Sequence, residues 1–322
     1  MEQIRVVRSF AAADALAELI EAEYDFTGPI TCKLFSKMLR TQDNDHYLIT
    51  TGNGDKYVIR VYQSGTRLER HESCYLYELD WLNFLKQKGI PVAYPIARKD
   101  GSFLGRLNAP EGMRYYAVFS YAHGAPLSLQ DEEQLYTMGR EIARIHLASN
   151  EYEPSHYRPE LDLEFLIDRP VERIKRYWDE DAEHIEDLDL LLFSAEDAKD
   201  QLLELINNEE STSDSWGPIG GDFHNRSVFF DGANQPTFFN FDWCGQGWRV
   251  YDIAVFLHST NLIHQDSPEL TEAFFAGYYS ERPLSPNEHA AIAPFLTVRR
   301  IWLTGWFMMN DGLAGHSFIA PL

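Results

Sequence analysis

The chain has 322 residues, with 28 Lys and Arg against 50 Asp and Glu, so its formal net charge is −22. This charge has the wrong sign for binding a phosphate backbone, and we expect no nucleic-acid partner. No apolar run approaches the roughly 18 residues of a membrane span, the N-terminus lacks a secretory pattern, and the three cysteines form no CxxC pair. We therefore expect a cytoplasmic protein with no membrane partner.

The first third of the chain is predicted to be a β-sheet with packed helices. In the run from Lys56 to Tyr62 alternate residues share a face, and Arg60 stands in the middle of one of them. Asn53-Gly54 supplies the positive φ angles of a tight turn before this run. The expected elements are a helix over residues 9–22, strands over 46–51 and 56–62, a helix over 76–85 that ends at Lys88-Gly89, and strands over 103–107 and 114–121.

The character of the chain changes at His123-Gly124-Ala125-Pro126, after which helical patterns predominate. We expect helices over residues 131–147 and 161–178 and near the C-terminus, with a domain boundary at this change. Residues 179–200 include ten acids and one base. Such a run indicates either a solvated helix face or a wall that attracts cations.

Two acidic residues flank a second predicted hairpin, formed by strands over residues 228–230 and 237–241. Folding this hairpin brings the loop before its first strand close to the residues after its second, so Asp222 and Asp242 would be neighbours. Two like charges repel each other, so we expect such an arrangement where the two carboxylates share a cation or divide the roles of base and ligand. Magnesium carried by a nucleotide phosphate fits that requirement. From the residues alone, a structural network is an equal alternative.

The residues around these acids form recognisable motifs: Gly220-Gly221-Asp222-Phe223-His224-Asn225-Arg226-Ser227, Asn240-Phe241-Asp242-Trp243 and Tyr251-Asp252-Ile253-Ala254. With them the chain resembles, from about Thr41 to about Ile301, the aminoglycoside phosphotransferase and choline kinase superfamily, the small-molecule branch of the protein-kinase-like fold. The resemblance makes Asp222 the catalytic base and Asp242 the metal ligand. It makes Asp252 structural, and His224 is then a scaffold of the loop.

Further segments match the same superfamily in the same order. The strand over residues 56–62 resembles the one that carries the phosphate-binding cation, which here is Arg60. Glu78 occupies the helix position that pairs with this cation, with Glu72 as a possible substitute. The segment Phe119-Ser120-Tyr121-Ala122 resembles the hinge that hydrogen-bonds adenine, which assigns Ser120, Tyr121 and Ala122 to nucleotide binding. Residues 138–146 resemble the first helix of the larger lobe.

The chain also departs from the family pattern His-Gly-Asp-x-His-x-x-x-x-Asn. Gly220 replaces the first histidine, and Ser227 replaces the asparagine that would bind metal. A serine hydroxyl is shorter than an amide and is a weaker ligand, so Ser227 is expected to give Asp242 only some help. Residues 31–45 contain no Gly-x-Gly-x-x-Gly motif.

Three tryptophans are candidates for contact with the acceptor. Trp302 and Trp306 lie one turn apart on a predicted apolar helix, where they are core residues by default. In the superfamily the C-terminal helices help to line the acceptor pocket, so these side chains could form its wall. Trp243, next to the metal aspartate, either packs or touches substrate.

The resemblance implies an α+β, bilobal, protein-kinase-like fold. Residues 1–119 would form a small N-lobe with an antiparallel sheet, residues 120–124 the hinge, and residues 125–322 a larger, mainly helical C-lobe. ATP and Mg²⁺ would lie in the cleft between the lobes. The implied activity is transfer of the γ-phosphoryl group to a hydroxyl of a small molecule, such as an aminoglycoside or an amino alcohol, and the acidic surface would suit a cationic acceptor.

Two alternatives remain open. One is a nucleotide-binding pseudokinase or regulator with weak or no transfer, suggested by Ser227 and Gly220. The other is a protein Ser/Thr kinase of the bacterial stress-response type.

Overall fold

The computed structural model describes residues 9–35, 44–63, 71–178, 185–207, 214–262 and 267–308. Contacts divide the chain into two units: residues 1–123 with 154–157, and residues 124–153 with 158–322. Residues 36–43, in the stretch without a glycine-rich motif, and residues 179–184 of the acidic stretch lie outside the described residues.

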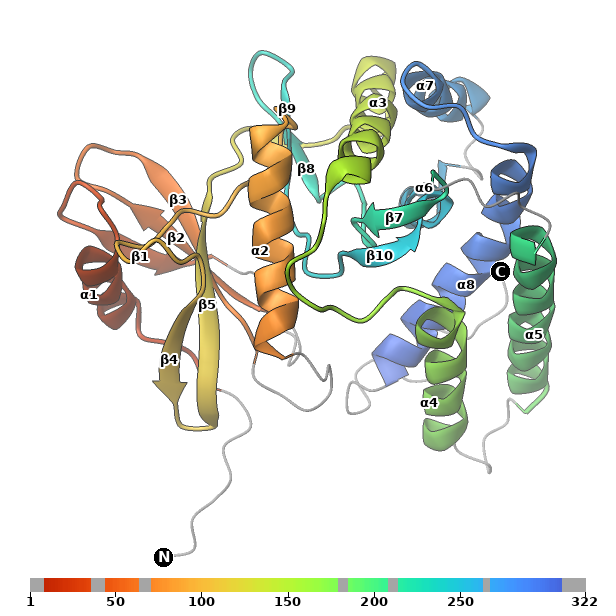
Figure 1. Cartoon of the computed structure of the whole chain (residues 1–322), viewed down its shortest axis with the longest axis horizontal. Helices are drawn as coiled ribbons and strands as arrows, with labels where there is room; N and C mark the ends of the chain where they lie inside the picture. Colours follow the sequence, from red (N-terminus) through yellow and green to blue (C-terminus); the bar gives the residue numbers. More distant parts are fainter. Residues whose placement is uncertain are drawn as a thin grey trace, which may run out of the picture. The chain divides into compact units, whose positions relative to one another are not determined.

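The first unit is built on a five-stranded antiparallel sheet with the strand order β1-β2-β3-β5-β4 (Figure 1). Its register pairs Tyr47 with Ile59 and Ile59 with Val118. The predicted strands are therefore present. Their bounds are β1 (Thr31–Leu34), β2 (Asp45–Thr50), β3 (Lys56–Val61), β4 (Gly105–Ala109) and β5 (Gly112–Ser120).

The two faces of this sheet are covered by different helices. On one face, Ile59 and Val61 of β3 join Leu16 and Ile20 of α1 (Ala13–Glu23) in a buried core. The alternation of the strand turns Arg60 to the opposite face, where α2 (Glu72–Gln87) lies. The period of two in the sequence thus decides that Arg60 meets α2 and not α1.

Helix α2 ends where the sequence predicts, because Gly89 adopts a φ of +75° that favours glycine. The N–H of Ile90 donates to the carbonyl of Leu85 at 3.0 Å, and that of Gly89 to Lys86 at 3.0 Å. This pair of bonds is a Schellman motif, which satisfies carbonyls at the helix end.

Helix α1 begins four residues later than predicted. Its expected first residue, Ser9, instead directs its hydroxyl and its N–H to the carboxylate of Glu111, at 2.7 and 3.1 Å. Ser9 is therefore engaged by the turn between β4 and β5 and does not cap the helix.

The second unit is mainly helical. Buried residues of β7, α4, α5, α6 and α8 form one apolar core, and Figure 1 shows α4 and α5 beside the long helix α8. Its helices are α3 (Glu132–Ala148), η1 (Ser149–Glu151), η2 (Glu164–Asp168), α4 (Arg169–Tyr177), α5 (Ile185–Asn207), α6 (Arg249–Thr260), α7 (Pro268–Tyr279) and α8 (Pro286–Met308).

Two small antiparallel sheets lie within this unit. One pairs β7 (Trp216–Ile219) with β10 (Gly245–Trp248), and the other has the order β6-β8-β9. The bounds of its strands are β6 (Ala125–Pro126), β8 (Val228–Phe230) and β9 (Pro236–Phe238). The predicted hairpin is present as β8 and β9, but its second strand ends at Phe238 and not at residue 241.

The single helix predicted over residues 161–178 is wrong in its first part. Leu161 forms a parallel bridge with Gly247, and its N–H donates to the carbonyl of Gln246 at 2.7 Å. A π-helical turn, η2, follows before α4 begins at Arg169. Backbone pairing with β10 therefore overrides the apolar spacing that suggested a longer helix.

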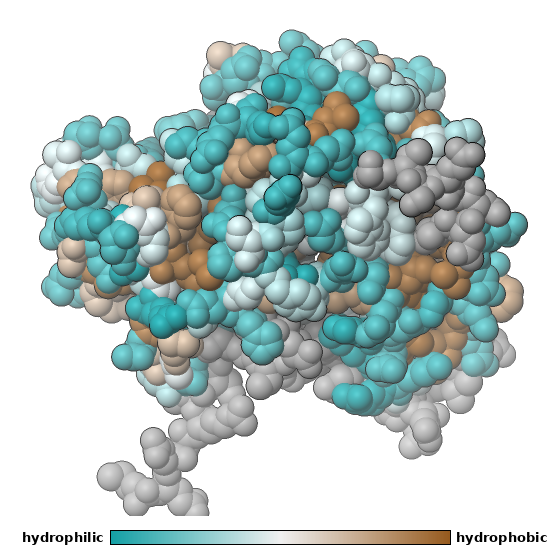
Figure 2. Space-filling model, in the orientation of Figure 1, coloured by the Kyte–Doolittle hydropathy of each residue, from teal (hydrophilic) through white to brown (hydrophobic). Residues whose placement is uncertain are grey.

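Hydrophilic residues occupy much of the face drawn in Figure 2, between separate apolar patches. Among the residues that the structure describes, no helix combines the length and the apolar character needed to cross a membrane.

Candidate active site

One buried carboxylate fixes the backbone of the loop between β7 and β8. The N–H of Gly220 donates to Oδ2 of Asp252 at 2.8 Å, and the N–H of Gly221 donates to Oδ1 at 2.7 Å. Gly221 has a φ of +73°, and a side chain there would collide with the carbonyl of Trp243. Asp252 on α6 therefore holds the two residues that lead directly into Asp222.

A chain of hydrogen bonds supports Asp252 from behind. Nε2 of His146 lies 3.1 Å from its Oδ2, and Nδ1 of His146 lies 3.0 Å from the hydroxyl of Tyr278, which accepts from Arg282 at 3.1 Å. Burial lowers the pKa of His146, so the ring is neutral and donates through Nε2. Burial also raises the pKa of Asp252 to about 7, although the two backbone N–H bonds oppose that shift.

The segment that carries Asp242 lies against this loop. Asn240 adopts a φ of +68°, which ends β9, and Arg158 donates to the backbone carbonyl of Asp242. The rings of Phe223 and Phe241, each adjacent to one of the two aspartates, meet edge to face at 5.7 Å. In addition, β7, which precedes the loop with Asp222, pairs with β10, which follows Asp242 in the chain. The two acid-bearing segments are therefore brought together.

His224 and Ser227 close a tight turn inside the loop. The Ser227 hydroxyl donates to the carbonyl of His224 at 2.7 Å and accepts from its N–H at 2.9 Å. Nδ1 of His224 accepts the N–H of Arg226 at 3.0 Å. Burial lowers the pKa of His224, and the charges of Asp222 and Asp242 both oppose this, so both carboxylates lie within electrostatic range of the ring.

The side chain of Asp222 is held by a residue that sequence reasoning missed. Arg299 on α8 donates from Nη2 to Oδ1 of Asp222 in an ion pair, and its guanidinium lies 4.8 Å from the ring centre of Trp302. Arg299 is only 3% exposed. The stretch Phe295–Trp302 holds two adjacent arginines, Arg299 and Arg300, among mostly apolar residues, and no local pattern says which of them is buried.

The structure brings the three predicted tryptophans into one cluster. Trp243 meets Trp302 and Trp306 edge to face, each with 4.7 Å between ring centres, and the latter two stack at 6.0 Å. Because the Arg299 guanidinium lies over the ring of Trp302, the tryptophan cluster contacts the residue that forms the ion pair with Asp222. Trp302 is buried, whereas Trp243 and Trp306 are half-buried.

In the first unit, Arg60 and Glu78 form a buried ion pair of 2.6 Å. The guanidinium of Arg60 also lies 4.7 Å from the ring centre of Phe119. Glu72, the possible substitute, binds Arg106 at the surface at 2.5 Å. The carboxylate that meets Arg60 is therefore that of Glu78.

Of the predicted hinge residues, Ser120 is the last residue of β5, and Tyr121 and Ala122 follow it directly. The N–H of Ser120 donates to the carbonyl of Tyr94 at 2.9 Å, and its hydroxyl accepts the Tyr94 N–H at 3.1 Å. The ring of Tyr121 lies beneath the ammonium group of Lys56 at 5.7 Å. Ala122 is half-buried.

The donor set suits a magnesium ion that arrives with a nucleotide. No group of three or more His, Cys, Asp or Glu side chains able to hold a metal occurs in the described ranges. Asp242 would supply one carboxylate, and Mg²⁺ commonly takes one or two carboxylates and completes its shell with phosphate oxygens and water. The residues therefore fit a nucleotide-borne Mg²⁺ better than a resident metal.

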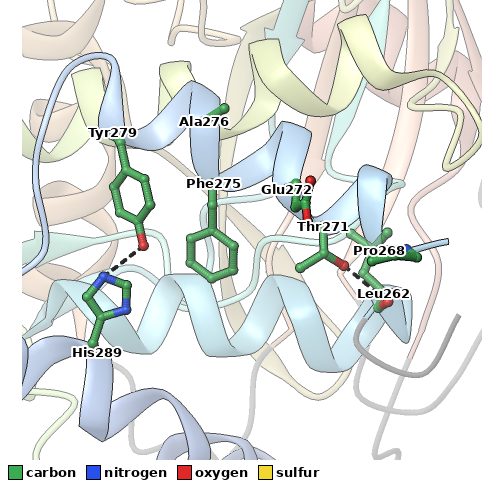
Figure 3. A pocket seen from close by; sticks show the side chains of 8 residues that line it. All are labelled: Leu262, Pro268, Thr271, Glu272, Phe275, Ala276, Tyr279 and His289. Atoms are coloured by element: carbon green, nitrogen blue, oxygen red, sulfur yellow. Dashed lines mark hydrogen bonds between the residues drawn. The ribbon is translucent and has the colours of Figure 1, made fainter.

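A cavity of about 590 Å³ lies elsewhere in the second unit, beside α7 (Figure 3). Phe275 lies at its centre, the Tyr279 hydroxyl and Nε2 of His289 are 2.8 Å apart, and Thr271 donates to the carbonyl of Leu262. None of the predicted site residues lines this cavity.

Residues 38–295 match the phosphotransferase enzyme family. An uncharacterized protein of Synechocystis, sll1119, is 31% identical over 92% of this chain and 78% of its own length. A homoserine kinase of Neisseria meningitidis is 27% identical over 77% of this chain and 73% of its own.

Solved structures with the same fold include an aminopropanol kinase associated with a microcompartment, with a TM-score of 0.74, 23% identity, and coverage of 95% of this chain and 92% of that one. Amicoumacin kinase in complex with AMP-PNP, Ca²⁺ and its antibiotic has a TM-score of 0.71 and 20% identity, over 93% of this chain and 87% of that one. At these identities the likeness concerns the fold alone. With the match over residues 38–295, the chain belongs to the phosphotransferase enzyme family, has the α+β kinase-like fold, and is an enzyme of the kinase type.

Proposed function

We propose that this protein transfers the γ-phosphoryl group of ATP to a hydroxyl of a small molecule, with Asp222 as the general base. The observation that carries the proposal is the contact between the loop that bears Asp222 and the segment that bears Asp242. Phosphoryl transfer needs positioned groups of these two kinds, a proton acceptor and a metal ligand, more than it needs covalent chemistry.

In the proposed reaction, the acceptor oxygen forms a bond to the γ-phosphorus while the bond from that phosphorus to the bridging oxygen of ADP breaks. Asp222 orients the hydroxyl and takes its proton, a contribution typically on the order of a hundredfold to ten-thousandfold. The bonds from Gly220 and Gly221 to Asp252 hold the backbone of the loop that carries this carboxylate.

We assign the nucleotide to residues of the first unit. Arg60 would bind the α and β phosphates, and Glu78 would hold its guanidinium in one orientation. The Ser120 N–H already bonds Tyr94, so we assign the adenine contacts to the backbone of Tyr121 and Ala122. The structure of a kinase relative with AMP-PNP is consistent with this nucleotide class.

We assign Mg²⁺ to Asp242, where the ion would neutralise phosphate charge when the nucleotide is bound. The donor hydrogen and one lone pair of the Ser227 hydroxyl are used inside the loop, so its share in metal binding is small. Phosphate oxygens and water would complete the coordination.

We propose a small alcohol that carries an amino group as the acceptor. Homoserine and aminopropanol, named for two relatives, share this chemistry. A cationic group suits the chain's charge of −22 and the half-buried rings of Trp243 and Trp306, since ammonium groups are attracted to tryptophan rings.

The test follows transfer of labelled γ-phosphate from ATP to homoserine, 1-amino-2-propanol and an aminoglycoside. Asp222→Asn should lower kcat about 100- to 10,000-fold with the KM for ATP within about twofold, because the base acts on the proton and not on the nucleotide. Asp242→Asn should instead raise the Kd of Mg-ATP about tenfold or more.

Asp200→Asn on the exposed face of α5 is the matched control. Equal effects of the two site variants on nucleotide affinity would refute the division of roles.

A second candidate is a nucleotide-binding regulator without transfer, favoured by the use of Ser227 inside the loop. Under that alternative, Mg-ATP would raise the melting temperature, but no acceptor, small molecule or protein, would become labelled.

A further inference from the structure

We propose that Arg299 is a positioning residue for the transfer reaction, which sets the direction in which Asp222 presents its proton-accepting oxygen. This inference rests on the proposed function. Four observations support it: the ion pair itself, the rigidity of the arginine, the separate fixation of the loop backbone, and the burial of the charge.

The guanidinium of Arg299 is fixed on two sides. Its Nη2 donates to Oδ1 of Asp222, and its plane lies over Trp302, one turn further along α8. Trp302 in turn packs edge to face against Trp243. Because a cation over an indole ring is held by electrostatic attraction and the ring is locked by its neighbours, Arg299 is a rigid support.

Asp222 needs such a support because the torsion that rotates an aspartate carboxylate has broad minima. The bonds from Asp252 to Gly220 and Gly221 fix the backbone of the loop, but they leave this torsion free. The bond from Arg299 to Oδ1 fixes it and leaves Oδ2 to meet the acceptor hydroxyl. The backbone of the base is thus held from α6 and its side chain from α8.

Stability alone gives little reason for this ion pair. Arg299 is 3% exposed, and a buried ion pair contributes little net stability, since desolvation of the charges opposes their attraction. Asp222 retains 15% exposure of its side chain, which leaves it accessible. A rigid, buried cation that contacts an accessible carboxylate is the arrangement expected when the orientation of that carboxylate matters for the reaction.

Arg299 touches no reacting atom in this proposal. The proton of the acceptor hydroxyl goes to Oδ2 of Asp222, the new bond joins the acceptor oxygen to phosphorus, and ADP leaves with the bridging oxygen. The arginine acts only through the carboxylate.

The experiment measures kcat and KM in Arg299→Met and Arg299→Lys, with Arg300→Met as the neighbouring control. The assay follows ADP release with the acceptor that the labelling panel identifies, and with water alone. Arg299→Met should lower kcat about 30- to 300-fold, because a small misplacement of a reacting group costs about a hundredfold, with the KM for ATP within about twofold. Arg299→Lys, a point charge without the planar fork, should recover part of the loss.

The decisive comparison is made in the Asp222→Asn background. If Arg299 acts through Asp222, adding Arg299→Met to Asp222→Asn should change the residual rate by less than about twofold, because coupled residues are not additive. The proposal is overturned if Arg299→Met alone keeps kcat within twofold of wild type, or if it lowers the rate equally in both backgrounds. A wild-type enzyme that phosphorylates no acceptor would instead sink the proposed function, and this role with it.

Discussion

Ser227 stands where the family pattern has an asparagine, and its hydroxyl is used twice inside the loop. This geometry distinguishes two roles. A structural hydroxyl stabilises the turn at His224, whereas a metal ligand would set the magnesium requirement.

Removal of this hydroxyl is therefore predicted to affect stability more than metal use. Ser227→Ala leaves the partly buried N–H of His224 without its acceptor, which should cost about 1 kcal/mol in the free energy of unfolding. The Mg²⁺ concentration for half-maximal rate should stay within about twofold. Urea unfolding and a magnesium titration measure the two quantities, with Ser194→Ala on α5 as the control. A tenfold rise in the magnesium requirement would identify Ser227 as a ligand.

Single residues also show where sequence reasoning succeeds and where it stops. The pairing of Arg60 with Glu78 was predictable from the family resemblance, whereas strand alternation alone marked only Arg60. Arg299 was not, because helical spacing marks a charged position as solvent-facing unless a partner distant in sequence is known. That partner, Asp222, lies 77 residues earlier.

At the scale of elements, strands and turns were more predictable than the starts of helices. Alternation and glycine at positive φ are local signals, and they located β2, β3 and the end of α2. The start of α1 and the stretch at Leu161 depend on partners elsewhere in the chain, Glu111 and β10, which no local pattern contains.

The contact of α6 with the loop between β7 and β8 is predicted to be essential for stability. In Asp252→Asn an NH2 group replaces one of the two oxygens, so a donor faces the N–H of Gly220 or that of Gly221. The free energy of unfolding should fall by about 2–4 kcal/mol, the range expected for breaking a buried polar pair. Urea unfolding measures it, and Asp200→Asn should stay within about 0.5 kcal/mol. A variant as stable as the wild type would show that Asp252 does not support the loop.

At the scale of the whole molecule, the half-buried His258 and the buried Asp252 link folding to pH in opposite directions. Burial, with the charges of Arg299 and Arg300 adding to it, lowers the pKa of His258 from 6.5 to about 4. The unfolded chain therefore binds this proton more readily, and stability falls as the pH drops from 6.5 to 4. Asp252 acts in reverse: its pKa is raised to about 7, so its contribution falls as the pH rises from about 4 to 7.

A comparison of wild type with His258→Gln isolates the histidine, since Asp252 is common to both. The wild type should lose stability relative to the variant as the pH falls from 6.5 to 4, with a slope of up to about 1.4 kcal/mol per pH unit for one proton. Urea unfolding at several pH values gives this slope. If the free energies of unfolding of wild type and variant ran parallel with pH, His258 would bind its proton equally well in the folded and the unfolded protein.

The match to the phosphotransferase family ends at residue 295, and Arg299 lies four positions further on, within α8. The ion pair to Asp222, our proposed base, thus comes from just beyond the residues that the family model matches, although the resemblance to the family extends to about Ile301. If Arg299 orients Asp222 as we propose, two enzymes with identical loops would differ in turnover when the aspartate of one of them lacks this arginine contact.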